Sequence, residues 1–348
     1  MSRRSKTLLI GVLVLVVASV VARSVQVPLV ALGPGPTFNT LGEVAGKQVV
    51  SVTGRPVYPT TGHLNMTTVS VTDGLNAVTA VRYWLKPDAE VVPRTAVYPA
   101  GASDAQVTQA NSEMFADSEN NAKVAALSYL HEPVKVVVTQ LTPNAPAGQL
   151  LKVGDQLVIV NGQRVSSAPQ VSKLLKSTRP GEQVPVTYQR GNGPPQNGTV
   201  TVGVRPGDQT GANPDGPQGF LGIFPVTEPV NPTQITVALD DVGGPSAGLM
   251  FSLGIVDKIT PDDLTGGKFI AGTGTIDETG AVGGISGIPL KMIGARSEGA
   301  TVFLVPGANC SEAKNSAPSG IQLVKVDTLT NAVNALQELK AGKPVPGC

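Results

Sequence analysis

Strand-like and helix-like patterns alternate along residues 220–348, and this is the feature that most constrains how the chain can fold. Short runs rich in valine and isoleucine are each followed by a longer segment of helical character. The predicted strands are 234–239, 268–276, 301–305 and 321–326, and the predicted helices are 245–259, 289–298, 309–317 and 328–340. This order predicts an α/β or α+β domain, which we assign to residues 207–348. The stretch 206–219 is polar and rich in Gly and Pro, so it reads as a linker or long loop.

Residues 26–130 do not alternate in this way, and their pattern predicts several strands followed by helix. Apolar runs at 49–52, 66–71 and 89–92 predict strands, and residues 103–130 predict helix. The chain has 40 glycines and 29 prolines, which favour short strands and turns. We expect a β-rich and helical region next to the membrane, and we find no chemistry in it.

Residues 131–206 carry the motif A-x-A-G-x-x-L-x-x-G-D-x-L-x-x-V-N-G between a strand at 134–138 and a helix at 170–177. The Asn161-Gly162 pair predicts a type I′ hairpin. In this order of elements the segment resembles a PDZ domain of the bacterial protease-associated kind.

The PDZ resemblance implies a peptide-binding groove, because PDZ domains add an extended peptide to a sheet edge. The groove is expected between the strand that contains Val136, Val137 and Val138 and the helix 170–177. The alternative is a PDZ fold that only packs against its neighbours.

The N-terminus predicts export. A basic flank at residues 2–6 precedes residues 7–22, TLLIGVLVLVVASVVA, which carry no charge. This pattern is typical of a secretory signal or signal-anchor, and positive charge stays on the cytoplasmic side. The run is slightly shorter than the roughly 20 residues of a full span, and Arg23 fits a cleavage site poorly. We therefore favour a retained transmembrane anchor, residues 1–25, over cleavage, with the remainder outside the cytoplasm.

Charge and cysteine content exclude several classes of partner. Lys+Arg is 26 and Asp+Glu is 25, so nothing indicates electrostatic capture of nucleic acid. Cys310 and Cys348 are too few for a cysteine-built zinc site or an iron–sulfur cluster, and we predict no metal and no cofactor. In an oxidising compartment the two cysteines could pair and tie down the C-terminal tail, and two unrelated thiols are the alternative.

One candidate nucleophile stands out. The segment G-G-P-S-A-G-L-M places Ser246 between a predicted strand and a helix, where free N–H groups and the positive helix end can stabilise an oxyanion. Gly243 and Gly244 allow close backbone approach. An ordinary glycine-rich helix start is the alternative. The chain has only two histidines, His63 and His131, both outside this domain in sequence, so a Ser-His-Asp triad is not expected.

A lysine remains as the base. Lys291 lies between apolar residues with no adjacent acid, and burial would lower its pKa toward the range in which an amine accepts a proton. The alternative is a partly buried stem with a solvated head group.

G-G-P-S-A-G-L-M-F followed by G-x-V-G-x-I-x-G-I-x-x-K-x-x-x-A resembles the proteolytic domain of Lon-type proteases, and more closely the bacterial family that joins it to a membrane anchor and a PDZ domain. The resemblance implies that Ser246 is the nucleophile and Lys291 the general base. It also implies that Thr273 orients the lysine. Lon-type domains commonly form rings, so the resemblance also allows a homo-oligomer such as a hexamer.

Two positions depart from the Lon pattern. Gly243 stands where Lon proteases carry an acidic residue, the nearest acids being Asp240 and Asp241, and Ser286 replaces a glycine. No G-x-x-x-x-G-K-S/T phosphate loop is present, so an ATP-driven unfolding module is not expected.

The predicted function is ATP-independent serine endopeptidase activity on unfolded or flexible chains, outside the cytoplasm. A non-catalytic anchored PDZ scaffold and a protein that cleaves only itself are the alternatives.

Overall fold

The computed structural model describes residues 10–13, 16–17, 20, 23–99, 101, 103–204, 217–230, 233–239 and 242–348. Much of the predicted anchor, most of the linker, and the acidic pair Asp240 and Asp241 lie outside these ranges. Among the residues that are described, no helix combines the length and the apolar character that a membrane crossing needs.

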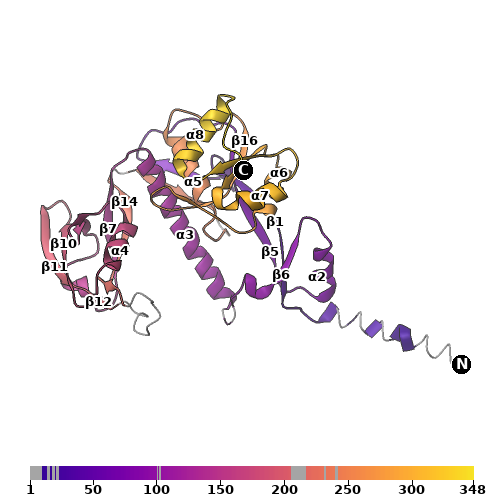
Figure 1. Cartoon of the computed structure of the whole chain (residues 1–348), viewed down its shortest axis with the longest axis horizontal. Coiled ribbons are helices and arrows are strands. Elements are labelled where there is room, and N and C mark those ends of the chain that lie inside the picture. The colour runs from indigo at the N-terminus through magenta and orange to yellow at the C-terminus, as the bar shows by residue number, and fades with distance from the viewer. Residues whose placement is uncertain are drawn as a thin grey trace, which may run out of the picture.

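Six strands form the central sheet, in the order β20-β19-β16-β5-β1-β6 (Figure 1). They are β1 (Leu29–Asn39), β5 (His63–Thr72), β6 (Glu90–Pro93), β16 (Phe269–Gly272), β19 (Val302–Pro306) and β20 (Gln322–Val326). Strands β5, β16, β19 and β20 are parallel, whereas β1 lies antiparallel between β5 and β6.

This sheet joins two segments that the sequence analysis treated as separate regions, 26–130 and 207–348. β5 pairs with β16, with Met66 opposite Gly272, so the two segments fold as one unit around the residues that lie between them in sequence. The sequence pattern predicts strands, but it carries no sign of which strands pair across 200 intervening residues.

Helices cover both faces of the sheet. Alternation along β19 shows the two sides: Val302 and Leu304 face one core, and Phe303 and Val305 face the other. The first core is completed by α3 (Asp104–Tyr129), α5 (Gly248–Ile259) and α8 (Leu329–Lys340), and the second by α6 (Ile288–Ser297) and α7 (Cys310–Ser316). A small third cluster lies under α2 (Ala77–Trp84), at the β1–β6 end.

Short elements fill the connections. They are β2 (Glu43–Val44), β3 (Lys47–Gln48), β4 (Val50–Thr53), β15 (Gln234–Val237), β17 (Thr275–Ile276), β18 (Val282–Gly283), and the 3-10 turns η1 (Arg94–Ala96), η2 (Pro146–Gln149) and η4 (Gly307–Asn309). The predicted strand 268–276 is therefore two strands, β16 and β17.

The second body has its own sheet, in the order β11-β10-β8-β7-β14, with β9 paired to β8. Its elements are β7 (Val134–Leu141), β8 (Gln156–Val160), β9 (Gln163–Arg164), α4 (Ala168–Lys176), β10 (Gln183–Gln189), β11 (Pro195–Thr201) and β14 (Ile223–Pro229), with the short pair β12 (Gly203–Val204) and β13 (Gly219–Phe220) beside them. Asn161 and Gly162 both have positive φ, as the predicted type I′ hairpin requires. The edge strand β14 lies beyond the predicted end of this unit at residue 206.

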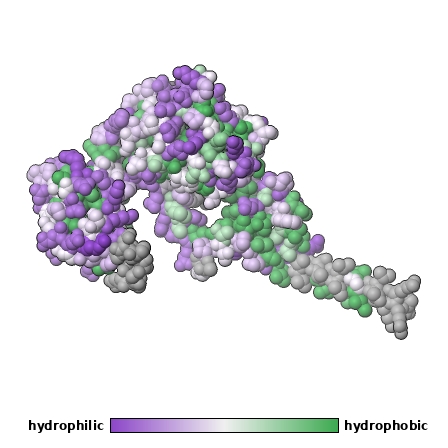
Figure 2. Space-filling model, in the orientation of Figure 1, coloured by the Kyte–Doolittle hydropathy of each residue, from purple (hydrophilic) through white to green (hydrophobic). Residues whose placement is uncertain are grey.

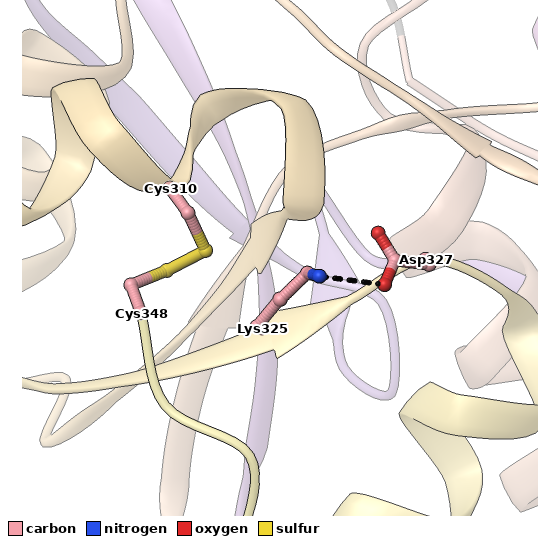
Figure 3. Close-up of a disulfide and its surroundings, with 4 residues drawn as sticks. All are labelled: Cys310, Lys325, Asp327 and Cys348. Carbon is pink, nitrogen blue, oxygen red and sulfur yellow. Dashed lines mark ion pairs between the residues drawn. A yellow bond between two sulfur atoms is a disulfide. The ribbon is translucent and has the colours of Figure 1, made fainter.

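Cys310 and Cys348 form a disulfide, with their Cα atoms 5.1 Å apart (Figure 3). Cys310 is the first residue of α7, and the tail that leads to Cys348 runs beside β20, where the Lys325 N–H donates to the Pro346 carbonyl at 2.9 Å. The tail is therefore held at two points, next to the Lys325–Asp327 ion pair that Figure 3 also shows.

Candidate active site

Ser246 lies in the segment that enters α5. The helix begins at Gly248, so Pro245 and Ser246 precede it and do not form its first turn as predicted. The reason is that the Ser246 carbonyl bonds outside the helix: it accepts the N–H of Gly274 at 2.9 Å and the hydroxyl of Thr273 at 3.0 Å. The hydrogen bonds to its own backbone carbonyl therefore hold Ser246 in place.

α3 holds the preceding residues. The Gly244 N–H donates to the Asn111 carbonyl at 3.0 Å, and the Ser118 hydroxyl donates to the Pro245 carbonyl at 3.0 Å. A Cβ at Gly243 would lie 2.9 Å from the Asn111 side chain, so glycine is what allows α3 to approach.

The sequence analysis expected the backbone at Gly243 and Gly244 to approach the substrate and support an oxyanion, and the structure excludes one of these two N–H groups as a donor. The Gly244 N–H is already engaged by α3 and cannot serve an oxyanion. Within the described ranges, the N–H groups of Ser246 and Ala247 donate to no protein atom. These two donors lie at the Ser246 hydroxyl and are available to a carbonyl oxygen of a substrate.

Lys291 projects from α6 toward this segment and is only 4% exposed. Its Nζ lies 2.7 Å from the Ser246 Oγ, 3.0 Å from the Thr273 Oγ1 and 3.2 Å from the Thr67 carbonyl oxygen. β5 supplies Thr67, the turn after β16 supplies Thr273, and the α5 entry supplies Ser246. The structure therefore brings together residues that lie far apart in sequence.

The hydrogen-bond partners of Lys291 determine how its amine is oriented. Thr67 offers only a carbonyl acceptor, and the Thr273 hydroxyl proton is used on the Ser246 carbonyl, so its oxygen can accept. A neutral amine has two N–H donors and one lone pair. In its neutral form Lys291 donates to these two oxygens and has its lone pair free for the Ser246 hydroxyl, whereas the ammonium form donates to all three oxygens.

Burial lowers the pKa of Lys291 from 10.5 to about 8, and no charged group contributes to this shift. Desolvation disfavours the ammonium form, as it does for other buried amines. The neutral amine is therefore readily available near neutral pH.

The dyad opens into a cleft of about 600 Å³. One wall is the stretch of β5 from Met66 to Ser70, and the other is the segment 284–286 after β18. Pro36 and Phe38 of β1 line the same cleft. Its size suits several residues of an extended chain.

Neither histidine lines the cleft. His63 stacks on Phe269 with ring centroids 4.5 Å apart, and His131 follows the end of α3 with a left-handed φ of 56°. Both have structural roles in the described chain, which leaves Lys291 as the base candidate next to Ser246.

The predicted peptide contacts Val136, Val137 and Val138 do not line a free sheet edge. β7 is paired on both sides, with β8 and with β14, and Val136 and Val138 are fully buried in the domain core. The edge strand beside α4 is β14 instead, where the Ala168 N–H of α4 donates to the Thr227 hydroxyl at 2.9 Å. The sequence analysis missed β14 because it follows the linker.

Comparison with known families identifies one domain. A family model described as a PDZ domain matches residues 106–202, so the chain contains a PDZ domain. A probable periplasmic serine endoprotease, DegP-like, of Halomonas elongata is 37% identical over 84 residues. That match covers 24% of this chain and 18% of the relative, so this chain corresponds to less than a fifth of the relative's length.

Two solved structures are also similar to part of the chain. They are the PDZ domains of SdrC-like proteins from Listeria monocytogenes and Listeria innocua, at 20% and 22% identity. Each covers 26% of this chain, and the matches span 86% and 92% of those structures, with a TM-score of 0.22 in both cases.

Proposed function

We propose that this chain is a Lon-type serine endopeptidase in which Ser246 is the nucleophile and Lys291 the general base. The observation that carries the proposal is the 2.7 Å separation of Nζ and Oγ, with the amine buried and in contact only with neutral oxygens. The motif resemblance and the cleft beside the two residues support it, and the DegP-like relative supports the broader assignment to serine proteases.

Acylation follows from this geometry. Lys291 takes the Ser246 proton as Oγ attacks the peptide carbonyl, and the N–H groups of Ser246 and Ala247 receive the oxyanion. The Lys291 ammonium then donates its proton to the leaving amine as the C–N bond breaks. Water then attacks the acyl-enzyme while Lys291 accepts one of its protons. The bond between the acyl carbon and the Ser246 Oγ breaks, Lys291 returns the proton to Oγ, and the product leaves as a carboxylic acid.

Thr273 acts as a positioning residue in this scheme. Its hydroxyl links the Ser246 carbonyl to the Lys291 amine, so one side chain fixes both partners of the dyad. The Thr67 carbonyl contributes the second fixed acceptor.

The PDZ domain supplies the peptide-capture part of the proposal. Strand β14 and helix α4 are adjacent at the edge of its sheet, and PDZ domains add a peptide strand to such an edge. Glu278 already contacts Thr227 at this edge, so the peptide would add along the rest of β14. Without a phosphate loop, the enzyme is expected to act on chains that are already unfolded, because it has no ATP-driven unfolding module. Capture of an extended segment at this edge suits such substrates. We further propose that residues 7–22 anchor the protein with the cleft outside the cytoplasm, as the basic flank and the DegP-like relative's periplasmic description both support.

Hydrolysis of casein by the full chain tests the activity. The substitutions Ser246→Ala and Lys291→Ala should each lower the rate by at least about a thousandfold while the circular dichroism spectrum is unchanged. A fluorophosphonate probe should label wild-type protein at Ser246, as mapped by mass spectrometry.

Undiminished cleavage by either variant would refute the dyad. Absence of both cleavage and labelling in the wild-type protein would favour the anchored scaffold, and labelling with cleavage of the chain itself alone would favour self-processing.

A further inference from the structure

Helix α2 is apolar on two opposite sides. Its inner side packs on the body through Ala80, which is 6% exposed and shares a cluster with Ala31 and Leu75. On its outer side the exposed fractions of Val78, Val81, Trp84 and Leu85 are 44%, 55%, 72% and 69%. The spacing of three, three and one residues places these side chains along one stripe of the helix.

An exposed stripe of this kind indicates a partner. Isolated apolar side chains on a protein surface need no explanation, but a contiguous patch that includes a tryptophan marks a contact surface. Within the described residues no other element covers the stripe, since Trp84 and Leu85 are the two most exposed large apolar residues.

The position of α2 indicates which partner it meets. Gln26 forms a β-bridge with Asn76, which is the N-cap of α2, and the Val27 N–H donates to the Leu75 carbonyl at 2.8 Å. The uncharged run 7–22 ends only four residues before Gln26. Four residues span at most about 14 Å, and an eight-residue helix is about 12 Å long, so α2 stays close to the end of that run.

The figures show the same arrangement. In Figure 1, α2 lies at the end of the body where β1 begins and the N-terminal segment departs, far from the PDZ domain. Figure 2 shows hydrophobic residues gathered over this end of the molecule.

We propose that the outer face of α2, defined by Val78, Val81, Trp84 and Leu85, docks on the surface of a lipid bilayer. Tryptophan favours the membrane interface, and short apolar stripes bind there by inserting a few side chains. The charged residues around the face include both signs (Asp73, Arg82, Lys86, Asp88, Glu90 and Arg94), so the attraction is apolar. The proposal rests on the proposed anchor and is independent of peptidase activity.

A single tryptophan makes the test specific. Trp84 is the only tryptophan of the chain, so all tryptophan emission reports on this face. The full chain is reconstituted into phosphatidylcholine vesicles, with and without phosphatidylcholine brominated near the headgroup end of its acyl chains. We expect brominated lipid to reduce the emission at least about twofold and the vesicles to shield Trp84 from aqueous iodide. The inactive variant Ser246→Ala should give the same result.

Two variants keep the reporter and change the face. Val81→Asp and Leu85→Ser should restore most of the emission in brominated vesicles, and Leu85 lies just beyond the last residue of α2, so its replacement leaves the fold intact. Val153→Asp is the matched control, because Val153 is 63% exposed but belongs to the PDZ domain. It should not change the quenching.

Three outcomes would overturn the proposal. The first is emission that stays open to iodide and insensitive to brominated lipid. The second is shielding from iodide without quenching by the lipid, increasing with protein density, which would assign the face to a second copy of the chain. The third is a chain that does not float with the vesicles.

Discussion

The Ser246–Lys291 pair depends on a single buried amine with no compensating charge. A lysine with a carboxylate partner would stay protonated, whereas Lys291 contacts only neutral oxygens, so burial alone sets its pKa. The burial that costs folding stability at neutral pH therefore also makes the neutral amine available for the proposed role as base. Such a trade between stability and activity is common at active sites.

The pH dependence of hydrolysis follows directly. Because the pKa of Lys291 is lowered to about 8 and only the neutral amine is a base, kcat/KM should increase with pH and level off above about pH 8. At pH 6 it should be about a hundredfold below the plateau. Initial rates of peptide hydrolysis across this range provide the measurement. A profile that is flat from pH 6 to 9, with folding intact, would contradict a lysine base.

Thr273 gives a second residue-scale prediction. Thr273→Val keeps the side-chain shape but removes both hydrogen bonds of the hydroxyl, so the lysine loses one fixed acceptor. We expect kcat to decrease about 10- to 100-fold with little change in KM, and Thr273→Ser to recover most of the loss. Thr301→Val, at an exposed position before β19, is the control. Equal losses in KM and kcat, or no rescue by serine, would count against a positioning role.

At the scale of elements, the sequence pattern predicted the bounds of a strand or helix well where the residues of that element alone determine its structure. The predicted strand 321–326 matches β20 within one residue, and the predicted helix 328–340 matches α8 equally closely. The start of α5 was wrong because tertiary bonds from Gly274 and Thr273 take the Ser246 carbonyl. Local propensity does not contain such bonds.

Asn309 connects the start of helix α7 to the wall of the cleft. It lies at the junction of η4 and α7, and its side-chain amide accepts the Ile285 N–H at 2.9 Å and donates to the Ile285 carbonyl at 2.8 Å. Ile285 lines the cleft, so this pair of bonds holds one wall in place.

Asn309→Ala should loosen the wall without touching the dyad. We expect kcat/KM for peptides to decrease about tenfold, mainly through KM, while the pH profile keeps its midpoint. Asn315→Ala, at an exposed position on the same helix, is the matched control. A shifted pH midpoint in Asn309→Ala would show instead that the substitution disturbs Lys291.

At the scale of the whole molecule, the sequence analysis identified the dyad candidates but not the framework that unites them. Ser246, Lys291 and Thr273 belong to recognisable motifs, whereas Thr67 contributes only a backbone carbonyl and Asn111 only a contact with a loop. Any residue type can supply a carbonyl, so no sequence signal marks these two positions. The pairing of β5 with β16 likewise depends on three-dimensional closure and not on local pattern.

Glu278 joins the PDZ domain to the body that carries Ser246 and Lys291. It is 6% exposed in the turn between β17 and β18, and its carboxylate accepts the Thr227 hydroxyl of β14 at 2.8 Å and is also stabilised by the Ala168 N–H of α4. The same hairpin leads into the cleft wall at 284–286. Burial is the largest cause of the raised pKa of this carboxyl.

The raised pKa of Glu278 predicts the direction in which the stability of the fold changes with pH. The pKa of Glu278 is raised, so the folded protein holds this proton more tightly than the unfolded chain does, and the protonated group stabilises the fold at low pH. This stabilisation is lost as the pH rises from the ordinary carboxyl pKa of 4.5 through the raised pKa. Glu278→Gln cannot ionise. Its unfolding free energy relative to wild type should therefore increase between pH 4 and pH 8, whatever constant cost the amide introduces. Glu182→Gln, at an exposed site on the PDZ domain, should show no such change in denaturant titrations at the two pH values. A pH-independent difference for Glu278→Gln would mean that the carboxylate is solvated, and that the PDZ domain is not docked through this contact on the body that carries Ser246 and Lys291.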